Sequence, residues 1–150
     1  MRISPEGLKF IREQEGFSLT VYPDLAGNPT VGTGHLLTPE EICKWPIGTT
    51  ITNEEAIDLE EEDVAEAEDA VNRLVLVPLS QSQFDAIVDF TFNEGGESLE
   101  RSTFLEDLNQ GHYRLAAAQL PEWDYAGGRP SSDLFKRRMA EQKMFLQECA

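Results

Sequence analysis

The chain has 150 residues, of which 28 are acidic and 12 basic, so its formal net charge is −16. This excess of negative charge argues against nucleic acid and anionic membranes as partners, because binding to phosphate groups depends on clustered Lys and Arg. Charged side chains interrupt the apolar residues of the N-terminal segment, so we expect neither a signal peptide nor a membrane anchor. We therefore expect a protein that is made soluble in the cytoplasm, and the length indicates one domain or two small lobes that share a helix.

The first third of the chain has the pattern of a helix followed by a hairpin. Ser4 is a predicted N-cap before a helix that ends near Gly16, which places Glu15 in its last turn. The stretch from Leu19 to His35 alternates, turns through Pro-Asp-Leu-Ala-Gly-Asn and returns, as a β-hairpin does. A further short helix is predicted to begin at Thr38.

The remainder of the chain is predicted to be helical. Residues 52–55 form a capping box at the start of a long helix of about twenty residues, with an apolar face predicted to comprise Ile57, Val64, Ala67, Val71 and Leu74. A second capping box at Ser80 begins a helix that ends before Gly95, with Phe84, Ile87, Val88 and Thr91 on its buried face. Shorter helices are predicted over Ser102–Gln110, Tyr113–Leu120 and Ser132–Gln147.

These elements predict an α+β fold that is mostly α and forms a single domain over residues 1–150. We expect a small lobe with the hairpin over about residues 12–60, and a connecting helix over about residues 53–75. A helical lobe should occupy about residues 78–150 together with the N-terminal helix, with a cleft between the lobes.

Three polar residues surround the predicted hairpin: Glu15 at the end of the first helix, Asp24 in the turn and Thr30 on the returning strand. Hydrolysis of a glycosidic bond needs one carboxylic acid to protonate the leaving oxygen and one carboxylate to activate water. Glu15 and Asp24 can meet this need if the hairpin folds back over the end of the helix, and the Thr30 hydroxyl can then hold a water beside Asp24. Spacing alone is weak evidence in a chain with so many acids.

The same stretch resembles the signature of the phage-type lysozymes, or endolysins, of glycoside hydrolase family 24. That signature is a Glu, an Asp or Cys nine residues later, a Thr six residues after that, an aliphatic residue and then Gly-x-Gly-His, and residues 15–35 match it at every position. Three further segments resemble conserved blocks of the family: Leu79–Gly95, Arg101–Gly111 and Trp123–Phe145. The last contains the Arg-Arg-x-x-Glu pattern of one branch, here Arg137, Arg138 and Glu141.

The resemblance implies a lysozyme-like fold and a muramidase that cleaves the β-1,4 bond between N-acetylmuramic acid and N-acetylglucosamine of bacterial peptidoglycan. It makes Glu15 the general acid, Asp24 the base or electrostatic partner and Thr30 the residue that positions water. Gly34, His35 and Asn93 become candidate substrate-binding residues, although pairing of His35 with a carboxylate of the long helix and a helix-ending role for Asn93 are open alternatives. The family generally inverts the anomeric configuration.

Two other functions stay open on the sequence: a lytic transglycosylase that cleaves the same bond without water, and a catalytically silent scaffold that binds peptidoglycan. The resemblance also implies synthesis in the host cytoplasm, action on the cell wall in the periplasm after membrane permeabilisation, and dependence on a separate hole-forming protein. We expect a monomer without cofactor or metal, because two histidines and no Cys-x-x-Cys offer no zinc site. Cys43 and Cys149 leave disulfide pairing undecided.

Overall fold

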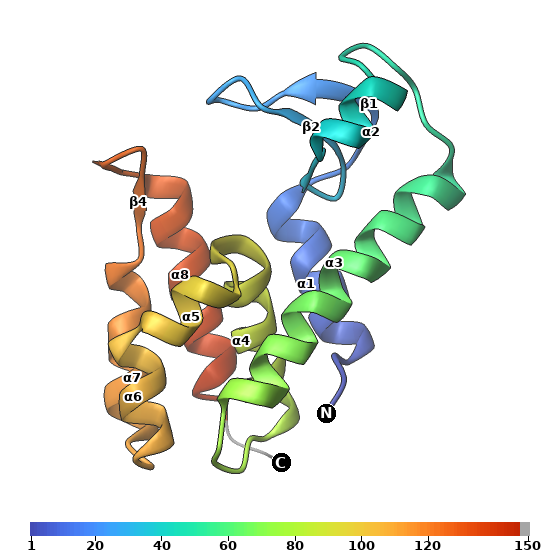
Figure 1. Ribbon diagram of the computed structural model, residues 1–150. Coiled ribbons are helices and arrows are strands. Elements are labelled where there is room, and N and C mark those ends of the chain that lie inside the picture. Colours follow the sequence, from blue (N-terminus) through green and yellow to red (C-terminus); the bar gives the residue numbers. More distant parts are fainter. Residues whose placement is uncertain (148–150) are drawn as a thin grey trace. The chain divides into compact units, whose positions relative to one another are not determined.

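A computed structural model describes residues 1–147, and these are mostly helical with two small antiparallel sheets (Figure 1). The chain divides into two compact units. We call residues Ile11–Ala65 the sheet unit, and Met1–Phe10 together with the chain from Glu66 onward the helical unit. The helices α1 (Pro5–Glu15) and α3 (Asn53–Leu74) contribute residues to both units. The predicted mostly helical α+β class is confirmed.

The sheet unit contains three antiparallel strands in the order β1 (Ser18–Pro23), β2 (Pro29–Gly32) and β3 (His35–Leu36). The first two form the predicted hairpin, in which Tyr22 pairs with Thr30. The third strand was not expected, because two residues are too few to show an alternating pattern. It becomes possible because Gly32 and Gly34 adopt positive φ angles of 64° and 68°, which reverse the chain between β2 and β3.

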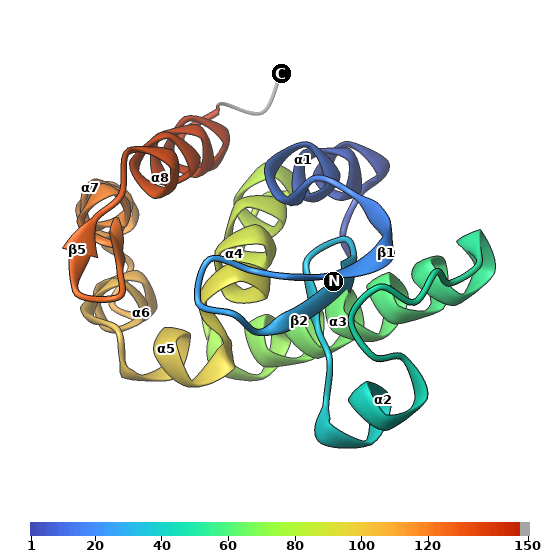
Figure 2. The same ribbon diagram turned by 90° about the horizontal axis from the view of Figure 1, so that it is seen from above.

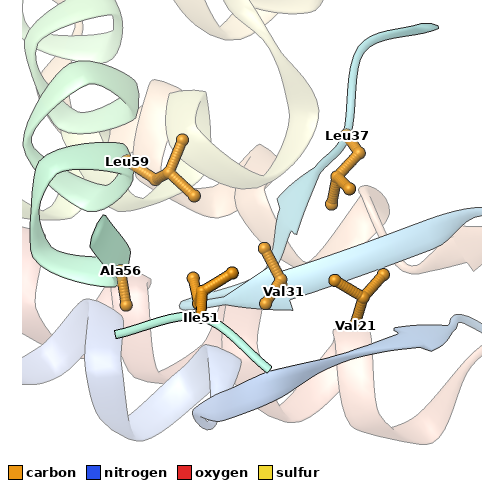
Figure 3. Close-up of a cluster of buried hydrophobic side chains, with 6 residues drawn as sticks. All are labelled: Val21, Val31, Leu37, Ile51, Ala56 and Leu59. Atoms are coloured by element: carbon orange, nitrogen blue, oxygen red, sulfur yellow. The ribbon is translucent and has the colours of Figure 1, made fainter. Parts of the chain in front are cut away.

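Apolar side chains from the strands and from the start of α3 meet in the core of the sheet unit. Figure 3 shows this cluster: Val21, Val31, Leu37, Ile51, Ala56 and Leu59. Trp45, which follows the short helix α2 (Pro39–Lys44), packs against the cluster. Each buried Val, Leu or Ile contributes about 1.5–3 kcal/mol. The cluster therefore holds the sheet against α3.

The predicted apolar face of α3 is wrong at one position in its first turn. Val64, Ala67 and Val71 are buried as expected, but Ile57 is 45% exposed. The first buried position is Ala56 instead, and the next turn buries the acidic residue Glu60 together with Leu59. The prediction for Ile57 was wrong because an aliphatic side chain was given more weight than the smaller Ala56 in front of it.

The helical unit is built around α4 (Gln81–Glu94), whose capping box at Ser80 forms as predicted. The expected helices are present as α6 (Thr103–Asn109), α7 (Tyr113–Gln119) and α8 (Ser132–Phe145). Figure 2 shows α5, α6, α7 and α8 in an arc beside α4. Three elements were not predicted: α5 (Gly96–Arg101), a short 3-10 turn at Leu120–Glu122, and the two-residue strands β4 (Tyr125–Ala126) and β5 (Arg129–Pro130).

Aromatic rings hold the middle of the helical unit together. The ring of Phe90 on α4 lies 6.1 Å from that of Phe104 and 5.2 Å from that of Trp123, which it meets edge to face. Phe104 in turn lies 6.0 Å from Phe145 of α8. The four predicted core positions of α4 are all buried. Trp123, like Trp45, is thus a packing residue.

Among residues 1–147, no helix combines the length and the apolar character needed to cross a bilayer. Cys43 lies exposed at the end of α2, whereas Cys149 falls outside the described residues.

Candidate active site

Glu15 is the last residue of α1, and its carboxylate lies directly over Gly34 in the turn between β2 and β3. The amide of Gly16 donates to the carbonyl of Arg12 at 3.0 Å, and its positive φ of 72° ends the helix there. A Cβ atom added to Gly34 would press on Oε2 of Glu15 and lie 3.1 Å from its Cδ. Glycine at position 34 is therefore required both by its backbone conformation and by the carboxylate next to it.

Asp24 and Thr30 are joined through Asn28 in the turn that connects β1 to β2. One carboxylate oxygen of Asp24, Oδ1, accepts hydrogen bonds from the amides of Ala26 and Asn28 at 2.9 and 2.8 Å. The other oxygen, Oδ2, has a longer contact of 3.5 Å to the side-chain amide of Asn28. The buried hydroxyl of Thr30 donates to the carbonyl of Asn28 at 3.0 Å. Asn28 thus fixes both side chains relative to one turn.

His35 begins β3, and each of its two ring nitrogens is paired with a carboxylate. Nδ1 lies 2.7 Å from Oδ2 of Asp63 on α3, and Nε2 lies 2.9 Å from Oε1 of Glu41 on α2. The hydrogen bond with Asp63 is the largest cause of a rise in the pKa of His35 to about 9, so the ring is protonated at neutral pH. The expected pairing with a carboxylate of the long helix is confirmed.

Asn93 belongs to the helical unit, in the last turn of α4. Its side-chain oxygen accepts a hydrogen bond from Nη2 of Arg138, which is itself fully buried. Because a guanidinium can only donate, the amide nitrogen of Asn93 must be on the side away from Arg138. Neighbouring Arg137 donates to both oxygens of Asp89 at 3.0 and 2.8 Å, while its Nε lies 3.9 Å from Oε1 of Glu141.

Comparison with known proteins decides the family. The family model described as phage lysozyme matches residues 12–141. The endolysin of Salmonella phage P22 is 38% identical over 148 residues, which cover 97% of this chain and 99% of that protein. The endolysin of Acyrthosiphon pisum secondary endosymbiont phage 1 is 39% identical over 149 residues, again 97% of this chain and 98% of that protein. This chain belongs to the phage lysozyme family.

A solved structure supports the same fold. The muramidase domain of SpmX from Asticaccaulis excentricus is 32% identical and superimposes with a TM-score of 0.84, covering 98% of this chain and 99% of that one. As a member of the phage lysozyme family, the chain is a glycosidase whose substrate is peptidoglycan. The fold and activity that the signature implied are thus confirmed, whereas the role of each site residue stays a proposal.

One group of residues beside Glu15 was not predicted from the sequence. Arg12, one turn before Glu15, donates from Nε and Nη2 to the two carboxylate oxygens of Glu60 on α3, at 2.8 and 2.7 Å. The hydroxyl of Thr33, next to Gly34, donates to the same carboxylate at 3.2 Å. Glu60 lies in a run of ten acids between Glu54 and Asp69, and it is four residues from each of the buried apolar residues Ala56 and Val64. An acid on the face of the helix that is otherwise apolar was the sequence signal that could have identified Glu60.

Proposed function

We propose that this lysozyme hydrolyses the β-1,4 bond between N-acetylmuramic acid and N-acetylglucosamine, with Glu15 as general acid and Asp24 and Thr30 activating water. Glu15 would protonate the glycosidic oxygen as the bond breaks, and Asp24 would take a proton from the water that attacks the anomeric carbon. The observation that carries the proposal is that two neighbouring turns of one sheet each contact one of the two carboxyl groups. Asp24 is hydrogen-bonded to Asn28 in the β1–β2 turn, and Glu15 of α1 lies against Gly34 in the β2–β3 turn.

The hydrogen bonds of Asp24 and Thr30 suit these two roles. Two backbone amides hold Oδ1 of Asp24, which leaves Oδ2, with its longer contact to Asn28, as the oxygen to accept a proton. The Thr30 hydroxyl donates a hydrogen bond to the carbonyl of Asn28. Its lone pairs are then left to accept a hydrogen bond from the attacking water, which orients that water beside Asp24.

Substrate binding is proposed for Gly34, His35 and Asn93, each in a different way. At Gly34 the absence of a side chain allows the sugar to approach the Glu15 carboxylate. For His35 the contribution is indirect, since its two carboxylate partners hold β3 in place. The Asn93 oxygen accepts from Arg138, so its amide nitrogen would donate to a sugar acetamido oxygen.

The biological setting that we propose is lysis of a bacterial host. The enzyme would be made in the host cytoplasm as a monomer and reach the periplasmic wall after a separate hole-forming protein has permeabilised the membrane. This setting is supported by the endolysins of two phages that are similar over almost the whole chain.

The test compares the clearing of outer-membrane-permeabilised Gram-negative cells by the wild type, Glu15→Gln and Glu6→Gln. Glu6 is an exposed acid on the same helix and serves as the matched control. Loss of a general acid should lower the clearing rate by about 10²–10⁴-fold. We expect this loss in Glu15→Gln alone, with wild-type products that end in reducing N-acetylmuramic acid.

Other results would favour the alternative functions. Product ends that carry an internal anhydro bond would indicate a lytic transglycosylase, and a wild type that does not clear cells would indicate a silent scaffold. Inversion would appear as release of the α-anomer first in proton NMR, as expected if the two carboxyl groups lie about 6.5–9.5 Å apart. Initial release of the β-anomer would contradict the role of Asp24 as a base.

A further inference from the structure

The position of the Glu15 carboxyl group depends on how the end of α1 meets the turn between β2 and β3. Glu15 is the last residue of the helix, and Gly16 ends it with a positive φ. The carboxylate lies against Gly34, where the side chain of any other residue would be. A shift of either the helix end or the turn would therefore move the carboxyl group relative to the bond that it protonates.

One buried side chain connects these two segments. Glu60 of α3 is only 4% exposed, and its carboxylate binds the guanidinium of Arg12 through two hydrogen bonds. The same carboxylate accepts from the hydroxyl of Thr33, which is 3% exposed. Arg12 lies three residues before Glu15, and Thr33 immediately precedes Gly34. Glu60 is thus hydrogen-bonded on both sides of the contact between Glu15 and Gly34.

The chemistry of this link explains why it is specific. A buried carboxylate is unfavourable unless it is paired and hydrogen-bonded, and the planar guanidinium of Arg12 matches it with two parallel bonds. The phase of α3 would otherwise place an apolar residue at position 60, as it does at Ala56 and Val64. Packing alone does not require an acid here, so the acid has another purpose.

We propose that Glu60 is a positioning residue for Glu15. It holds the last turn of α1, through Arg12, to the turn that contains Thr33 and Gly34, and in this way it fixes the carboxyl group in the geometry for proton transfer. This inference rests on the proposed role of Glu15 as the general acid. A displacement of about 1 Å in a reacting group can lower a rate about 10²-fold, so a link of this kind has a measurable effect.

The first experiment measures kcat and KM on soluble, uncrosslinked peptidoglycan strands for Glu60→Gln and Glu61→Gln. Both variants lose one negative charge from adjacent positions of α3, but Glu61 is exposed. We expect Glu60→Gln to lower kcat about 10–100-fold with KM changed less than about two-fold, while Glu61→Gln matches the wild type. Equal kcat values for the two variants would overturn the proposal.

A second experiment uses Thr33, which remains informative if Glu60→Gln does not fold. Thr33→Val keeps the shape and loses the hydroxyl, whereas Thr33→Ser keeps the hydroxyl and loses a methyl group. Positioning predicts that the Val variant lowers kcat about three-fold or more and that the Ser variant restores it. A purely packing role predicts the opposite order, and that order would overturn the proposal.

A double variant separates this inference from the proposed function. If Glu60 acts through Glu15, Glu60→Gln should cause no further loss of kcat in the Glu15→Gln background. A further loss of the same size in both backgrounds would contradict positioning. If Glu15→Gln alone retains full activity, both the proposed function and the positioning role of Glu60 are overturned. A loss in Glu15→Gln with none in Glu60→Gln overturns the positioning role only.

Discussion

At the scale of single residues, the candidate site depends on one position without a side chain. Gly34 combines a positive φ of 68° with direct contact to the Glu15 carboxylate. These are two separate reasons for glycine, because the first concerns only the backbone and the second concerns only the neighbour. They can be separated experimentally, because Gly48 in the same unit has a φ of 95° and no atom within 4 Å of an added Cβ.

We predict that Gly34→Ala lowers kcat about 10–100-fold, because the new methyl group displaces the Glu15 carboxyl group. Gly34→Ala and Gly48→Ala should each lower the free energy of unfolding by about 1–2 kcal/mol, since both force alanine into the left-handed region. Steady-state kinetics and urea denaturation of the two variants measure these effects. Full activity in Gly34→Ala would show that the contact with Glu15 is unimportant.

The residues of the site differ in how well the sequence alone predicts them. Glu15, Asp24 and Thr30 stand at a characteristic spacing around a turn rich in glycine, so a single chain suffices to propose them. Glu60 is one of ten acids of α3, and the sequence marks it only by its distance of four residues from both Ala56 and Val64. Asn28 acts mainly through its backbone groups, which carry no signal in the sequence at all.

At the scale of elements, local chemistry predicted the helices with caps and missed the pieces that depend on neighbours. The predicted capping boxes at Thr52 and Ser80 form in the structure, because the side chain and the backbone that it binds are only three residues apart. The glycine pair at Gly95 was read as the end of helical structure. α4 does end there, with Gly95 at a φ of 93°, but α5 begins at the next residue and was not predicted.

Short strands were missed for another reason. β4 and β5 have two residues each, too few for periodicity, although Gly127 and Gly128 between them both have positive φ, as a tight hairpin turn requires. The Gly-Gly pair was therefore a usable signal. The strand β3 is also short, and it owes its place to the contacts of His35 with α2 and α3.

These contacts of His35 predict a pH-dependent stability. Its pKa of about 9 in the folded state is above the ordinary value of 6.5, so the stabilisation is complete below about pH 6.5 and is lost as the pH rises through about 9. We expect about 1–2 kcal/mol, which is less than the full shift implies, because the partner carboxylates are about a quarter exposed.

The measurement is urea denaturation of the wild type, His35→Asn and His112→Asn at pH 6 and pH 10. His112 is exposed and its side chain makes no helix-capping hydrogen bond, so it serves as the control. The wild type should exceed His35→Asn in stability by more at pH 6 than at pH 10, and His112→Asn should follow the wild type. A difference that grows toward pH 10 would show that the ion pairs are not the cause.

At the scale of the whole molecule, the net charge of −16 should affect how the enzyme reaches its substrate. Bacterial cell walls are anionic, so the exposed acids of α3 repel the surface on which the enzyme acts. Salt screens this repulsion, and we predict that the initial clearing rate rises about two-fold or more between low and physiological ionic strength. Turbidity assays over a range of sodium chloride concentrations measure the effect.

A charge-neutralised variant provides the control for this prediction. Replacing the exposed acids Glu54, Asp58, Glu61 and Glu62 by their amides removes charge and leaves the buried Glu60 in place. This variant should clear cells faster than the wild type at low salt and respond less to added salt. Activity of the wild type that falls steadily from the lowest ionic strength would mean that attraction, and not repulsion, governs the approach.

The division of the chain into two units also affects the order in which its parts can assemble. Residues 11–65 are contiguous, so the sheet unit has its own hydrogen-bonding partners as soon as that stretch has left the ribosome. The N-terminal segment, in contrast, binds Glu68 through the amide of Ile3, and Asp85 through the amide and hydroxyl of Ser4. Ile3 and Ser4 must therefore wait for partners that lie more than sixty positions later in the chain, and their segment of the helical unit can be completed only after those residues have been synthesised.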